Sequence, residues 1–158
     1  MKKSKLRLGE AICVLLLILF IFFTASQNTV SDTPFDDVSK STLGACNLEG
    51  LEERDGLALK KKFSFEADSF NGFTYYCSDS VMDVRELLII GVKQDSSART
   101  VTQALTKYVE EKEKIFDGYA PKESELISSH VMLNKKGYIL FYIGEEKEKV
   151  VSAFSDSL

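Results

Sequence analysis

Glu86 is the residue of this sequence whose type and position most suggest chemistry. It interrupts the apolar strand expected between Val84 and Val92, in which Arg85 is the only other charged residue. A carboxyl group buried in such a stretch needs a partner, or its pKa rises. Glu86 is therefore a candidate for ligand contact or acid–base work, whereas the more common arrangement is a glutamate that faces solvent or pairs with a lysine.

The chain has one histidine, His130. A histidine that acts as a general base needs an orienting carboxylate and a nucleophile. Ser128 and Ser129 are its neighbours in the sequence, but the chain has no Gly-x-Ser-x-Gly elbow. These observations favour a structural histidine, and a hydrolase that uses Glu86 or His130 remains an alternative function.

Tyrosines are abundant near the predicted strands and could line a shallow aromatic groove. Such residues more often pack between a sheet and its helices, with their hydroxyl groups at the rim. From these tyrosines we select Tyr119 and Tyr138, together with Glu86, as speculative ligand-binding residues.

Cys46 and Cys77 are the only cysteines outside the first hydrophobic segment. Two thiols of an exported domain can form a disulfide, and closing this loop would add about 3–4 kcal/mol to the free energy of unfolding. The sequence leaves open whether they pair or remain separate thiols. With one histidine and three cysteines in the whole chain, a zinc module is excluded, and we expect neither a metal nor a cofactor.

The first 26 residues predict where the chain resides. Four cations within residues 1–10 precede an apolar run over residues 11–23, and the next basic residue is Lys40. This positive-inside pattern predicts a basic cytoplasmic head (1–10), a membrane segment (11–26) and a domain outside the cytoplasm. The run covers only about 20 Å of a ~30 Å hydrocarbon core. We favour an uncleaved single-pass anchor in the cytoplasmic membrane, and the alternative is a secreted protein cleaved near Ser26.

The composition of the remaining chain is that of a globular domain. The chain is 44% apolar and 28% charged, with a net charge of −4, which excludes general disorder and a multi-span membrane protein. Residues 27–158 carry 16 basic and 23 acidic residues. An acidic domain without a basic stripe is not expected to bind nucleic acid. Residues 27–45 are polar and read as a stalk, which leaves residues 46–158 as the domain.

The apolar spacing of this domain predicts four strands and their helices. We expect helices over residues 48–63, 121–127 and 146–154, and a long helix that is capped within residues 95–97 and ends at Gly118. We expect strands over residues 73–77, 84–93, 129–133 and 138–143. The loop over residues 134–137 contains Gly137, where φ is expected to be positive. Placing the two most apolar strands at the centre gives an antiparallel sheet of order 1-2-4-3. With its helices on one face, this is a two-layer α+β fold.

Three blocks of the sequence resemble an uncharacterised family. They are Met-Asp-Val-Arg-Glu-Leu-Leu-Ile-Ile at 82–90, Phe-Asp-Gly-Tyr-Ala-Pro-Lys-Glu at 116–123 and Lys-Gly-Tyr-Ile-Leu at 136–140. In residue type and spacing they resemble the "domain of unknown function" family four-three-five-eight (DUF4358), over about residues 48–158. The resemblance implies an exported domain of Gram-positive, clostridia-like bacteria, and it implies no activity, cofactor or catalytic residue. This chain lacks the cysteine motif of the lipid-anchored members.

These observations together predict a membrane-anchored extracytoplasmic domain that binds rather than catalyses. Its expected partners are the membrane, through residues 11–26, and an envelope protein or cell-wall component. A weaker alternative is that the hydrophobic segment itself pairs with another membrane helix, but it lacks a small-residue packing motif.

Overall fold

The computed structural model describes residues 14–17, 31–93 and 95–158. The chain divides into two units, Met1–Val30 and Ser31–Leu158, and the fold below is that of the second. Most of the predicted membrane segment lies outside the described residues. Residues 14–17 are its described part, and they are helical. Among the described residues, no helix combines the length and the apolar character that a membrane span requires.

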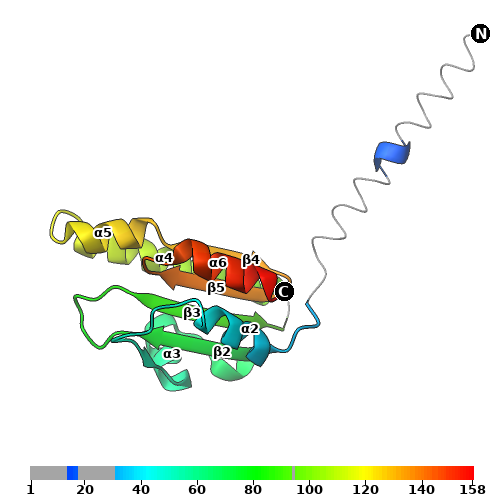
Figure 1. The fold of residues 1–158 in the computed structure, drawn as a ribbon, viewed down its shortest axis with the longest axis horizontal. Helices are drawn as coiled ribbons and strands as arrows, with labels where there is room; N and C mark the ends of the chain where they lie inside the picture. The colour runs from blue at the N-terminus through cyan, green and yellow to red at the C-terminus, as the bar shows by residue number, and fades with distance from the viewer. Residues whose placement is uncertain (1–13, 18–30, 94) are drawn as a thin grey trace, which may run out of the picture. The chain divides into compact units, whose positions relative to one another are not determined.

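One antiparallel sheet forms the centre of the Ser31–Leu158 unit (Figure 1). Its order is β1-β2-β3-β5-β4, with β1 at Glu52–Glu53, β2 at Phe70–Cys77, β3 at Glu86–Val92, β4 at Val131–Lys135 and β5 at Tyr138–Ile143. The predicted mutual order of the four main strands is confirmed. Every residue of β3 and β5 is buried, as expected of central strands that are apolar on both faces.

The fifth strand, β1, corrects the prediction of a helix over residues 48–63. Glu52 and Glu53 pair with Cys77 and Tyr76 at the edge of β2, and the helix α3 spans only Gly56–Phe63. It begins there because the Asp55 side chain accepts a hydrogen bond from the backbone N–H of Ala58, at 2.9 Å.

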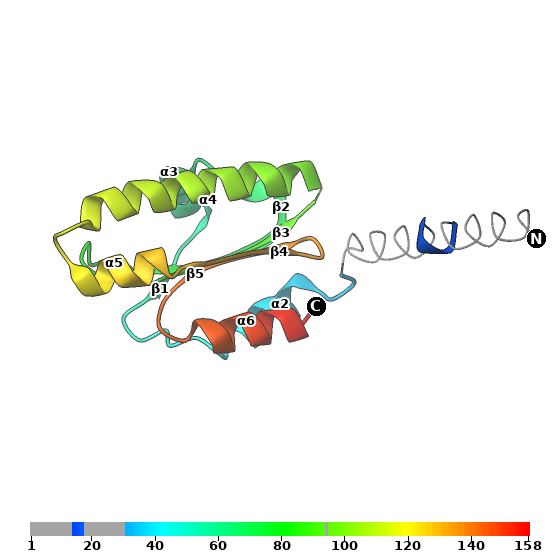
Figure 2. The ribbon, with the colours of Figure 1, turned by 90° about the horizontal axis from the view of Figure 1, so that it is seen from above.

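Helices cover both faces of the sheet, so the prediction of helices on one face is wrong. Helices α3, α4 (Asp95–Phe116) and α5 (Pro121–Ser128) lie on one face, and α2 (Phe35–Leu43) and α6 (Lys147–Asp156) on the other (Figure 2). The physical reason is the alternation along β3, where Leu88 and Ile90 enter one core and Leu87 and Ile89 enter the other. Two apolar sheet faces need two helical layers, and together with the sheet between them these make a domain of three layers.

Helix α2 lies within the predicted stalk, so residues 31–45 belong to the domain. Val38 is fully buried against the sheet, and the Ser39 and Thr74 hydroxyl groups are hydrogen-bonded at 2.7 Å. The Phe35 ring lies over Gly72 so closely that a Cβ atom there would be 2.6 Å from it. The polar composition of this segment concealed a helix with a narrow apolar stripe.

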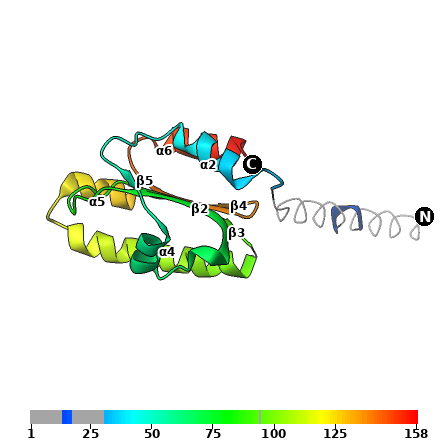
Figure 3. The ribbon, with the colours of Figure 1, turned by 90° about the horizontal axis from the view of Figure 1, so that it is seen from below.

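The sheet gives the domain two distinct ends (Figure 3). At the hairpin end, Ser31 meets the β4–β5 turn, where its N–H donates to the carbonyl of Lys136 at 2.8 Å. We call the opposite end the cavity end. It is formed where β2 and β5 finish and β3 begins, together with the β2–β3 loop (residues 78–85) and the α4–α5 connection (residues 117–120).

Candidate functional site

Three hollows border the β2–β3 loop at the cavity end, and the smallest of them, of about 370 Å³, lies against α3. The two larger ones share part of their lining. One, of about 520 Å³, is the Lys112 cavity, and we define it by Lys62, Glu86, Tyr108, Lys112, Ile115 and Tyr119. The other, of about 730 Å³, is the Glu145 cavity, between the β2–β3 loop, α5 and the start of α6. Ser80, Met82, Asp83 and Arg85 line both hollows, so the β2–β3 loop separates them.

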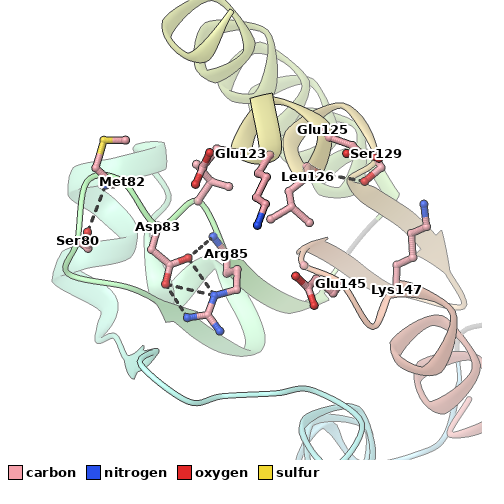
Figure 4. A pocket seen from close by; sticks show the side chains of 13 residues that line it. Ser80, Met82, Asp83, Arg85, Glu123, Glu125, Leu126, Ser129, Glu145 and Lys147 are labelled. Carbon is pink, nitrogen blue, oxygen red and sulfur yellow. Dashed lines mark hydrogen bonds and ion pairs between the residues drawn. The ribbon is translucent and has the colours of Figure 1, made fainter. Parts of the chain in front are cut away.

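The Glu145 cavity has charges of both signs. Figure 4 shows Arg85 hydrogen-bonded to Asp83 on one side, and Glu145 and Lys147 across the hollow. The Arg85 Nη2 to Asp83 Oδ2 distance is 2.6 Å. All the charged residues that line this hollow are at least partly exposed. Such side chains can be solvated independently, and this hollow has no buried charged group around which a site would be organised.

The Lys112 cavity is built around a buried carboxylate, since Glu86 is fully buried. Its Oε1 accepts a hydrogen bond from the Tyr75 hydroxyl at 2.6 Å and pairs with Lys62 Nζ at 3.1 Å. Its Oε2 accepts from the Tyr108 hydroxyl at 2.7 Å and from Lys112 Nζ at 3.1 Å. Four donors therefore hold the two carboxylate oxygens.

Four elements bring these donors together. Glu86 is the first residue of β3, and Tyr75 comes from the neighbouring strand β2. Lys62 lies in the last turn of α3. Tyr108 and Lys112 are four residues apart on α4, so both project from one face of that helix toward the sheet.

The donors determine the protonation state of Glu86. Burial acts to raise the pKa of Glu86, but the charges of Lys112 and Lys62 and the two tyrosine hydroxyl groups outweigh it, and the pKa is lowered. Burial and the Glu86 charge raise the pKa of Tyr75 and Tyr108, so both hydroxyl groups remain protonated donors. Glu86 is thus an ionised, fully engaged carboxylate with no proton to give at neutral pH.

Exposed apolar side chains surround the mouth of this cavity. We call Val81, Met82, Ile115 and Tyr119 the apolar rim, and their exposed fractions run from 44% for Met82 to 87% for Val81. Apolar groups gathered around a hollow are typical of a binding surface rather than of an ordinary solvated face.

The structure brings together two of the three selected ligand-binding residues. Glu86 and Tyr119 line the same cavity. Tyr138 lies toward the hairpin end, because it pairs with Gly91 whereas Glu86 pairs with Ile143. The Tyr138 hydroxyl donates to the carbonyl of Thr33 at 2.6 Å, and its side chain belongs to the other core. Tyr138 therefore does not share this cavity with Glu86 and Tyr119, since proximity to an apolar strand in the sequence does not fix which end or face a side chain occupies.

His130 has none of the partners that a general base requires among its described contacts. Its Nδ1 is 2.9 Å from the carbonyl of Ile127, and its ring lies 6.1 Å from that of Phe141. The neighbouring Ser129 hydroxyl donates to the carbonyl of Leu126. The position agrees with a structural histidine.

The two cysteines of the domain are free thiols. Cys77 packs against the core on the α4 side of the sheet, and Cys46 packs against the core on the α2 side. The disulfide is therefore not formed, because the sheet lies between them. Burial, with a smaller contribution from Glu146, raises the pKa of the Cys46 thiol to about 12.

Lys62, Tyr108 and Lys112 were missed as site residues. Lys62 ends a run of three lysines that the sequence predicts to be a solvated helix end. Lys60 fits that prediction, because it forms an exposed ion pair with Glu66. A signal was present at Lys112, which shares the apolar face of α4 with Tyr108. A lysine on such a face indicates a buried acid opposite. No cluster of residues suited to a metal ion occurs in the described parts of the chain.

The family model for a domain of unknown function, DUF4358, matches residues 45–144. The chain belongs to this family. The DUF4358 match takes in the five strands and the helices α3, α4 and α5, and it includes every residue of the Lys112 cavity. It ends at Gly144, earlier than the resemblance suggested, so α2 and α6 lie outside the matched range. No curated protein and no solved structure matches the chain.

Proposed function

We propose that this DUF4358 protein is a membrane-anchored extracytoplasmic binding module, and that the Lys112 cavity with its apolar rim is the binding site. One observation carries the proposal. The most buried charged group of the cavity, Glu86, is fully engaged by four donors, whereas the apolar side chains around it are exposed. Hydrogen bonds and ion pairs thus fix the interior of this site, and the exposed apolar side chains of its rim are available to contact a ligand or partner.

The geometry gives no support to the alternative of a hydrolase. Glu86 has both oxygens occupied and a lowered pKa, so it is a poor general acid. The described polar contact of the His130 side chain is to a backbone carbonyl, which orients the ring but does not activate a nucleophile.

The location outside the cytoplasm rests on the pattern of residues 1–26, with four cations ahead of an apolar run. Within the domain, Ser31 is at the hairpin end, and the Lys112 cavity is at the other. The first residue of the domain therefore lies at the end opposite the proposed site.

Two reporters fused at Leu158 test the location. A phosphatase that folds only outside the cytoplasm should be active, and a fluorescent protein that folds only inside should be dark. The opposite result would contradict export. The mass of the N-terminal peptide of the mature protein then distinguishes an anchor from a product cleaved near Ser26.

Site-specific photocrosslinking in cells tests the binding surface. A crosslinker at Tyr119 should form one dominant adduct with an envelope component. The matched control is Leu57 on α3, which is 73% exposed and apolar but does not line the Lys112 cavity. Equal adducts at the two positions would show that Tyr119 contacts partners only by being exposed.

A further inference from the structure

We infer that the Lys112 cavity binds a small carboxylate that carries an apolar group, with its carboxylate between Lys62 and Lys112 and its apolar group on the rim. The inference rests on the proposed binding function and specifies the chemical class of the ligand.

The first step is the local charge of the cavity. Two ammonium groups, those of Lys62 and Lys112, share the single carboxylate of Glu86 at 3.1 Å each. This trio has an excess of one positive charge. The acidic groups on the β2–β3 loop have other partners, because Asp79 pairs with Arg54, which also pairs with Glu52, and Asp83 pairs with Arg85.

The second step is the donor capacity of the two lysines. An ammonium group has three N–H donors. Lys112 Nζ is within reach of Glu86 and of the carbonyl of Val84, at 3.1 and 3.4 Å, and it lies 5.1 Å from the centroid of the Tyr108 ring. Lys62 Nζ pairs with Glu86 and otherwise lies over the rings of Tyr75 and Tyr108. Among the described contacts, each ammonium thus has an N–H that no oxygen acceptor takes, and a ligand oxygen is a stronger acceptor than the face of a tyrosine ring.

The third step is access from the cavity. The side chain of Lys62 is 34% exposed and that of Lys112 is 16% exposed, whereas Glu86 is not exposed at all. A ligand that enters the cavity therefore meets the cations and not the carboxylate. A partly buried cation in excess is stabilised by an incoming anion, because the anion replaces the water that burial removes.

The last step is the class of anion. One excess charge matches the single charge of a carboxylate better than the larger charge of a phosphate monoester. The cavity of about 520 Å³ has the size of a small-molecule site. Ile115 and Tyr119 on its rim offer apolar contact beside the cations. The complementary ligand is consequently an apolar group that ends in a carboxylate.

The test uses the full-length protein in lipid nanodiscs and three probes. The first, 4-phenylbutyrate, is an apolar acid, and the second, N-acetylphenylalanine, represents the carboxyl end of a peptide. The third, 4-phenylbutanol, is the uncharged control. Methyl NMR signals of Met82 and Ile115 should shift with either acid, and the signal of Leu57, exposed elsewhere on α3, should stay. The acid that binds more tightly identifies the source of the carboxylate.

Two variants and one matched control assign the effect to the lysines. Lys62→Met and Lys112→Met each leave Glu86 with one cation, so the domain should fold, which circular dichroism verifies. Each should weaken binding of the acid by about tenfold, the loss of one charge-assisted hydrogen bond. Lys61→Met changes the neighbouring lysine on α3, which does not line this cavity, and should leave the affinity unchanged.

Two results would overturn the inference. In the first, neither acid shifts the signals of Met82 or Ile115, and in the second, 4-phenylbutanol binds the wild-type protein as tightly as 4-phenylbutyrate does. In either case a crosslink specific to Tyr119 in an exported protein would leave the proposed binding function intact. A reporter that places the domain inside the cytoplasm would instead contradict the proposed function, whatever the probes do.

Discussion

A single carboxylate organises the cavity end of this domain. Sequence reasoning identified Glu86 as a group that needed a partner, and it included pairing with a lysine among the arrangements. The structure supplies two lysines and two tyrosines from three other elements. None of these four lies within ten residues of Glu86 in the sequence, so their convergence depends on how α3, α4 and β2 pack.

Glu86→Gln should destabilise the domain by about 3 kcal/mol at neutral pH, because it leaves two partly buried lysines without their counter-charge. Denaturation followed by circular dichroism measures the loss. Glu110→Gln, which changes an exposed glutamate of α4, should change the free energy of unfolding by less than about 0.5 kcal/mol. Tyr108→Phe removes one donor and should cost about 1–2 kcal/mol.

The same residue predicts a pH dependence. The folded-state pKa of Glu86 lies below its ordinary value of 4.5. The unfolded chain therefore binds this proton more readily, and the stabilisation is complete above pH 4.5 and is lost as the pH falls toward the folded-state pKa. The wild-type protein should lose stability across this acid range more steeply than Glu86→Gln. Parallel curves would contradict an ionised Glu86 in the folded state.

At the scale of elements, helix α2 shows how a polar composition can conceal a packed helix. Asp36, Asp37 and Lys40 give the segment the character of a linker. The face of α2 that packs on the sheet consists of Val38 with Phe35 and Leu43. This face is covered because Leu87 and Ile89 of β3 lie in the same core. A narrow apolar stripe in the sequence indicates a packed helix only when the surface that it covers is also known.

Val38→Ala should lower the free energy of unfolding by about 2 kcal/mol, since it removes two fully buried methyl groups. Lys40→Ala, at an exposed position of the same helix, should have little effect. The two variants are compared by urea denaturation. Equal stability of both would indicate that α2 does not pack on the sheet in solution.

The β4–β5 turn is tighter than the four-residue loop predicted. Lys136 and Gly137 have φ values of 50° and 85°, the geometry of a two-residue turn with both central residues in the left-handed region. Gly137→Ala should therefore cost about 1 kcal/mol in the free energy of unfolding. Gly44, with φ of −62° at the end of α2, is the control. Gly44→Ala should be neutral or slightly stabilising. Thermal unfolding followed by circular dichroism measures the stability of both variants.

For the whole domain, the number of layers decides which residues can meet. The sheet carries a core on each face. Residues that are close in sequence, such as Tyr76 and Cys77, belong to different cores. A disulfide between Cys46 and Cys77 would be possible if both lay on one face of the sheet. Because the domain has a core on each face, the two thiols lie on opposite sides of the sheet.

Mass spectrometry of the oxidised, non-reduced protein should find no peptide that links Cys46 to Cys77. The Cys46 thiol should also react much more slowly with iodoacetamide at pH 8 in the folded protein than in urea, because burial raises its pKa to about 12. Rapid alkylation of Cys46 in the folded state would show that α2 and α6 do not cover it.

The sequence by itself determined the properties that depend on local pattern. Apolar runs identified the four main strands and the long helix α4, whereas the anchor and the topology indicated by the cations ahead of an apolar run stay predictions. The central placement of β3 and β5 followed because residues apolar on both faces must be covered on both sides. The same argument, applied to the helices, would have predicted the third layer.

Only the tertiary structure decided which side chains form the site. Glu86 and Tyr119 share a cavity with Lys62, Tyr108 and Lys112, and Tyr138 does not. A one-dimensional pattern gives the face of an element, but it does not give the end of the sheet at which the element finishes or the distance to side chains on other elements. These follow from strand register and helix placement, which many weak contacts across the whole domain determine together.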